Sequence, residues 1–171
     1  MSKRQEFRVY DYVNHPYASV RDALLLDPRG IFERATTTAA ARAHALGAAI
    51  HVKVGPLDLV ADVAITVVAI DEARSPLGQP ATRLELDWKS TNRPDWFPTM
   101  KGTLLVYALT STETQLDFSG TYEPPMGIVG AAIDALILHK VVAEASVLHF
   151  VQDVAAYLRA TPEGARSRAA H

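Results

Sequence analysis

A long apolar stretch from Pro125 to Arg159 constrains the fold of this chain more than any other feature. Pro125 suits the first turn of a helix, where its missing N–H costs nothing. Thr161-Pro162 and Gly164 end the helical pattern. A helix of this length would extend about 50 Å, beyond the average for globular proteins. We therefore expect the rest of the chain to be organised around it.

One side of this predicted helix is apolar at helical spacing. The apolar stripe consists of Val129, Ile133, Leu136, Ala143, Val147, Val151, Val154 and Leu158. Lys140 and Glu144 fall in the middle of the same stripe, one helical turn apart. A charged pair on a buried face indicates that the helix faces a cavity rather than a dry core. The alternative is an internal ion pair, or a lysine that reaches solvent at the helix edge.

Composition limits the classes of function. A chain of 171 residues is long enough for one domain with a real core, expected over residues 1–160, with a disordered tail over 161–171. The net charge of −2 gives no reason to expect nucleic-acid binding. The absence of cysteine excludes thiolate catalysis. No signal segment and no uninterrupted run of about 20 apolar residues is present, so we expect a cytoplasmic protein without stable membrane insertion.

The chain ahead of the long helix alternates as strands do, with helical patterns near its start. Residues 5–13 suit a first strand, and 17–26 and 36–46 suit two short helices, separated by a turn at 27–30. Later strand patterns occupy 48–54, 57–70, 82–91, 101–110 and 113–122, the last two as a hairpin around Ser111-Thr112. Consecutive strands with short connections predict an antiparallel meander, and their separation from the helices predicts an α+β fold.

The junction before the long helix carries a family resemblance. It reads Gly120-Thr121-Tyr122-Glu123-Pro124-Pro125-Met126-Gly127, followed by Gly130 and Asp134, and the helix closes with Phe150-Val151, Val154 and Leu158. With the order of elements, it resembles the START-like (SRPBCC) superfamily, which includes the polyketide cyclase/dehydrase and birch pollen allergen groups. The resemblance extends from about Phe7 to Leu158.

The resemblance implies a helix-grip fold. In that fold a curved, seven-stranded antiparallel sheet wraps around the C-terminal helix, and a deep, largely apolar pocket lies between them. Six strands are evident in the pattern. The seventh would lie around Ile31 to Thr36, or residues 48–70 would divide differently.

Aromatic side chains are the first candidates for such a pocket. Trp88, Phe118 and Tyr122 fall on inward strand faces, and Tyr107 is expected to join them. They would line an apolar pocket and present polar tips to a ligand. The alternative is plain core packing.

The loop from Asn92 to Met100 presents Trp96 and Phe97 in a polar context. Exposed aromatic residues on a loop suggest a pocket lid, a partner surface or a membrane-docking tip. The alternative is that they fold back and plug one end of the sheet. No pair of histidines has metal-ligand spacing beside a carboxylate, and no nucleotide motif is present, so we expect neither a metal nor a cofactor.

Three functions remain open. The first is binding of a small hydrophobic molecule, such as a lipid, isoprenoid or polyketide, for which Leu136, Lys140, Glu144 and the aromatic candidates would form the site. The second is a polyketide cyclase/dehydrase-like enzyme, with Lys140, Glu144 and Tyr122 or Tyr107 as acid/base groups. The third is a protein-interaction domain. An apolar outer helix face, with Leu138, Val142, Ala145 and Ala156, also suggests a homodimer.

Overall fold

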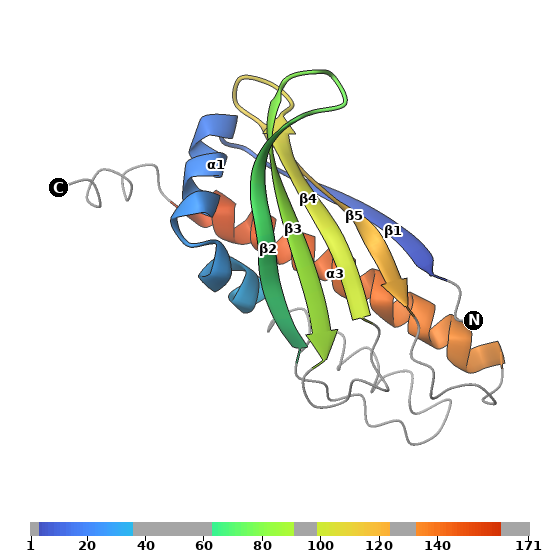
Figure 1. The fold of residues 1–171 in the computed structure, drawn as a ribbon. Helices are drawn as coiled ribbons and strands as arrows, with labels where there is room; N and C mark the ends of the chain where they lie inside the picture. The colour runs from blue at the N-terminus through green and yellow to red at the C-terminus, as the bar shows by residue number, and fades with distance from the viewer. Residues whose placement is uncertain (1–3, 36–62, 91–98, 124–132, 162–171) are drawn as a thin grey trace.

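The computed structural model describes residues 4–35, 63–90, 99–123 and 133–161. Its elements are β1 (Gln5–Val13), α1 (Tyr17–Leu26), β2 (Val63–Arg74), β3 (Pro80–Ser90), β4 (Thr99–Ala108), β5 (Thr114–Glu123) and α3 (Ile133–Ala160). The five strands form one sheet in the order β1-β5-β4-β3-β2, and every neighbouring pair is antiparallel. The long helix α3 lies along one face of this sheet (Figure 1).

This architecture confirms the predicted α+β fold, with an antiparallel sheet packed on a long C-terminal helix. Strands β2 to β5 form the predicted meander, and the β4–β5 hairpin turns at Ser111-Thr112 as expected. The first strand pairs with the last, so that Phe7 lies opposite Gly120 and Val9 opposite Phe118. This pairing brings β1 beside α3. We call the face of the sheet that packs against α3 the inner side, or inner face.

A second helical segment, residues 28–35, follows α1 where the sequence suggested a turn. Asp27 caps its start, because the backbone N–H of Gly30 donates to Asp27 Oδ1 at 2.9 Å. Pro28 then occupies the first helical position, where proline is favoured. The possibility of a strand around Ile31 is therefore wrong. The helix predicted for 36–46 and the strand predicted for 48–54 lie outside the described residues.

An aromatic cluster forms the centre of the core. The ring of Phe150, on α3, lies 5.0 Å from Trp88, 5.6 Å from Phe118 and 5.8 Å from Phe32 between centroids. Phe7 extends the cluster at 5.2 Å from Phe118. Strands β3 and β5 and the helical segment 28–35 therefore all pack on one side chain of α3, and β1 joins the cluster through Phe118.

The predicted apolar stripe is confirmed over the C-terminal half of α3. Val147, Val151, Val154 and Leu158 are buried, as expected. Phe150 is also fully buried, although the predicted stripe left it out. It lies three residues after Val147 and four before Val154, which are the spacings of neighbours on one helix face.

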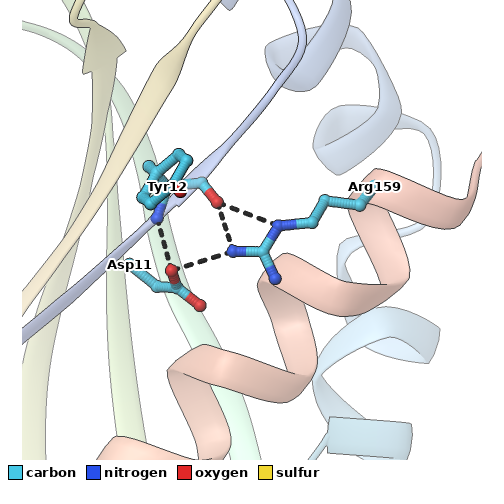
Figure 2. Close-up of polar contacts among 3 residues, drawn as sticks. All are labelled: Asp11, Tyr12 and Arg159. Carbon is cyan, nitrogen blue, oxygen red and sulfur yellow. Dashed lines mark hydrogen bonds and ion pairs between the residues drawn. The ribbon is translucent and has the colours of Figure 1, made fainter.

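The last turn of α3 is tied to the end of β1 by Arg159 (Figure 2). Its guanidinium donates to Asp11 Oδ1 at 2.8 Å and from Nε to the carbonyl oxygen of Tyr12 at 3.1 Å. The backbone N–H of Tyr12 donates to the same Asp11 carboxylate at 2.8 Å. A partly exposed ion pair contributes about 1 kcal/mol or less, so this contact mainly sets the position of the helix end.

Candidate functional site

The strand register places Gln5, Tyr122, Met100, Trp88 and Ile65 side by side across all five strands. We call these five residues the end row, because each lies within two residues of the end of its strand. Alternation along the strands directs the end row to the inner side, together with the aromatic core.

The end row combines burial with polar side-chain tips. Trp88, Met100 and Tyr122 are 5%, 6% and 3% exposed. The hydroxyl of Tyr122 donates to Gln5 Oε1 at 3.2 Å. The indole Nε1 of Trp88 is buried and has no hydrogen-bond partner within the part of the chain that the structure describes. An unmatched buried donor costs about 1–3 kcal/mol, so it marks an unusual position in the inner wall.

Sequence reasoning identified Trp88 and Tyr122 but missed Gln5 and Met100. Gln5 has the alternation phase of Phe7 and Val9, which a stricter reading of the first strand would have extended by one step. Met100 was assigned to the loop that precedes the strand, yet β4 begins at Thr99. Both omissions arose at strand ends, where the local pattern is weakest.

Tyr122 has a raised pKa. Burial is the main cause, because it disfavours the charged phenolate, and the negative charge of Glu144 raises the pKa further. Tyr122 therefore keeps its proton at neutral pH. Its phenol can serve as a hydrogen-bond donor or as a weak acid, and it is not poised to act as a base.

The raised pKa of Tyr122 predicts a loss of stability at alkaline pH. Tyrosine in the unfolded chain ionises near pH 10, whereas folded Tyr122 holds its proton to higher pH. The stabilisation is complete below about pH 10 and is lost as pH rises through the folded pKa. We expect Tyr122→Phe to flatten the fall in unfolding free energy measured in urea between about pH 9 and 11. The same substitution at Tyr10, which is 67% exposed, should leave the slope unchanged; equal slopes for all three proteins would contradict the prediction.

In the row next to the end row on the inner face, aromatic rings fill the space over two glycines. Gly102 and Gly120 lie opposite each other in β4 and β5. A Cβ built on Gly102 would lie 2.4 Å from the ring of Phe118, and one on Gly120 would lie 2.8 Å from the ring of Phe7. The two rings thus occupy the space that side chains would take. Phe118 is 1% exposed. Its surroundings therefore fit the alternative that it packs in the core.

Tyr107 lies on the opposite face of the sheet from the end row. It alternates with Leu104 and Val106 along β4 and stays outside the inner core cluster. Burial raises its pKa first, and the charge of Asp117 raises it further. The expectation that Tyr107 joins the inward aromatic residues is corrected, because alternation directs residue 107 outward.

The outer face contains a hollow of about 540 Å³ whose lining includes Arg8, Arg83 and Asp117. Asp117 is 5% exposed and accepts two hydrogen bonds from Arg8, at 3.0 and 2.7 Å. Arg83 is paired with Asp71 at 3.3 Å. Arg8 and Asp117 are thus paired within the hollow, Arg83 is paired with a residue outside its lining, and we assign no ligand to it.

Glu144 is exposed, which corrects the expectation of a charged pair on a buried face. Among the described side chains of α3, burial of the stripe begins at Val147, so the helical phase did not ensure burial at Glu144. The side chains of Leu136 and Lys140 lie outside the described residues, as do Trp96 and Phe97. Their place in a site stays a prediction.

The described ranges contain neither a candidate metal site nor a candidate membrane span. No group of three histidine, aspartate or glutamate side chains there is arranged to hold a metal ion. No helix in those ranges has the length and apolarity needed to cross a membrane.

The fold and the end row define an α+β protein of helix-grip architecture, with hydrogen-bonding groups at one end of its inner wall. No protein-family model matches the chain, and no curated protein matches it. Similar solved structures include the Zhui aromatase/cyclase from a Streptomyces species, at 12% identity and a TM-score of 0.46, covering 91% of this chain and 94% of that one.

Two other similar structures come from two further organisms. Truncated norcoclaurine synthase from Thalictrum flavum has 9% identity and a TM-score of 0.45, covering 94% of this chain and 97% of that one. A START superfamily protein from Mycobacterium smegmatis has 12% identity and a TM-score of 0.42, covering 90% and 96%. These structures are similar to this chain in fold alone, and likeness at this level assigns neither a superfamily nor an activity.

Proposed function

We propose that this protein binds a small, mainly apolar molecule, such as a lipid, an isoprenoid or a polyketide-like compound, between the inner face of the sheet and α3. The observation that carries the proposal is the end row, where Trp88 and Tyr122 hold polar tips within a buried apolar wall. Pockets for small molecules typically combine apolar walls with a few placed polar groups.

Apolar and polar groups would contribute differently to ligand binding in such a site. Burial of apolar ligand surface supplies affinity, at about 25 cal/mol per Å². Polar groups add orientation, because a buried donor or acceptor left unmatched is costly. Met100 lies between Trp88 and Tyr122, and its flexible thioether side chain can adapt to different ligand shapes.

Binding is tested with the neutral fluorescent probe N-phenyl-1-naphthylamine. We expect saturable binding by the wild-type protein and at least about tenfold weaker binding by Met100→Trp, because the larger side chain fills the middle of the end row. Leu105→Trp is the matched control, since it adds the same side chain to the outer face of the same strand. Equal loss in both variants, or no loss in either while circular dichroism shows both folded, would reject the inner-face site.

The second candidate is a polyketide cyclase/dehydrase-like enzyme that works by proton transfer. The feature in its favour is that the negative charge of Glu144, after burial, raises the pKa of Tyr122. A neutral phenol and a carboxylate can serve as an acid and a base, and Lys140 stays a candidate third group.

Proton transfer is tested without knowledge of the natural substrate. The ketone 1-tetralone exchanges its α-protons in deuterium oxide when an acid polarises its carbonyl and a base removes the proton. An enzyme would accelerate this exchange over buffer, and Tyr122→Phe would abolish the acceleration. Tight probe binding with proton exchange at the buffer rate would reject the enzyme and keep the binding function.

A further inference from the structure

The indole N–H of Trp88 is a buried donor of the end row that has no hydrogen-bond partner within the described residues. Nearly all buried polar groups in folded proteins are hydrogen-bonded, and the hydroxyl of Tyr122 follows this rule through Gln5. Trp88 Nε1 is buried without a partner in the same part of the chain. Packing alone does not require a donor here, because a phenyl ring would serve the contact with Phe150.

We propose that Trp88 is a specificity-determining residue that donates its indole N–H to an acceptor oxygen of the bound ligand. This inference rests on the proposed binding function and deepens it by naming the ligand class. The preferred ligand is an apolar molecule with a carbonyl or comparable acceptor oxygen, and a pure hydrocarbon of the same shape is disfavoured. Indole is a donor only, so it matches an acceptor and never a ligand donor.

The position of Trp88 limits where that oxygen lies. Its ring contacts Phe150 on one side, at 5.0 Å between centroids, and its neighbours in the end row are Ile65 and Met100. These described neighbours of the indole ring are all apolar. A hydrogen bond in such surroundings is stronger than one exposed to water, so a single ligand oxygen at Trp88 has a large effect on selectivity.

The donor is covered in the structure, because Nε1 is buried. A ligand oxygen must therefore replace the protein atoms that cover it. Met100 is the adjacent side chain best suited to move aside, since its three rotatable bonds allow it to repack. Tyr122 lies two strands away, about 10 Å between Cα positions, so it contacts a different part of the ligand than Trp88 does.

The test compares two ligands that share one skeleton, 1-tetralone and tetralin. Tetralone carries a carbonyl and tetralin does not. Calorimetric titration of the full chain is expected to show tetralone binding about tenfold more tightly than tetralin, the effect of one net hydrogen bond in a buried site. Trp88→Phe keeps an aromatic ring against Phe150 and removes the donor, so it should remove the preference while tetralin still binds.

A second readout does not depend on that variant folding. The chain has two tryptophans, so Trp96→Phe leaves Trp88 as the only source of an indole N–H resonance in the proton NMR spectrum. Tetralone is expected to move this resonance downfield, because its carbonyl accepts a hydrogen bond from the indole N–H. Tetralin is expected to cause no such downfield shift.

The outcomes separate this inference from the proposed function. Equal affinity for the two ligands, with the indole resonance responding equally to both, overturns the role of Trp88 and leaves inner-face binding intact. If neither ligand binds and N-phenyl-1-naphthylamine also fails, the binding function falls and the inference falls with it. A preference for tetralone that survives Trp88→Phe assigns the selectivity to another donor and overturns the inference.

Discussion

Phe150→Ala is expected to lower the free energy of unfolding by about 3–5 kcal/mol. The side chain is fully buried, and its ring lies against Phe32, Trp88 and Phe118. Truncation leaves a cavity where the helical segment 28–35, two strands and α3 meet, and rings from several elements cannot collapse into it together. Equilibrium unfolding in urea, followed by far-ultraviolet circular dichroism, measures the change.

Leu148→Ala is the matched control for Phe150→Ala. Leu148 lies two residues earlier on the same helix and is 38% exposed. Its truncation should change the unfolding free energy by about 1 kcal/mol or less, because it leaves no closed cavity. A loss of stability at Leu148 as large as that at Phe150 would contradict the central place of the aromatic cluster.

Gly120→Ala is expected to cost about 3 kcal/mol, a large effect for one added methyl group. The new Cβ would lie 2.1 Å from the carbonyl oxygen of Lys101 and 2.7 Å from the Cα of Gly102. Both are backbone atoms of β4, so relief requires a shift of the strand rather than a side-chain rotation. Urea unfolding measures the loss, and proton NMR should report displaced ring resonances of Phe7, which also lies within 2.8 Å.

Ser119→Ala controls for Gly120→Ala at the adjacent position. Ser119 faces the outer hollow, and its replacement removes a hydroxyl without adding bulk. We expect a change within about 0.5 kcal/mol. If Gly120→Ala proved as mild as Ser119→Ala, the close approach of β4 and β5 at this row would be wrong.

Local sequence patterns predicted the elements that depend only on neighbouring residues. The first strand was predicted at residues 5–13 and is observed as Gln5–Val13. The alternation in residues 82–91 correctly predicted that Trp88 is buried. The turn around Ser111-Thr112 was equally local. These features depend on residue types within a few positions, so the sequence carries them directly.

Candidate site residues were predictable only where strand alternation was clear. It placed Trp88 and Tyr122 inside, and the structure brings them into one row with Gln5 and Met100. It could not place Glu144, because helical phase identifies a face and says nothing about where along the helix that face is covered. Tyr107 is buried on the outer face, away from the inner row to which it was assigned.

The sequence by itself determined the α+β class, the periodic face of the C-terminal helix and the approximate positions of the described strands, because these follow from local residue spacing. Only the tertiary structure decided that β1 pairs with β5, which sets Arg8 beside Asp117 across 109 positions. It also decided that the rings of Phe7 and Phe118 occupy the space over two glycines. Contacts between distant segments are selected by the packing of the whole core, and no local pattern encodes them.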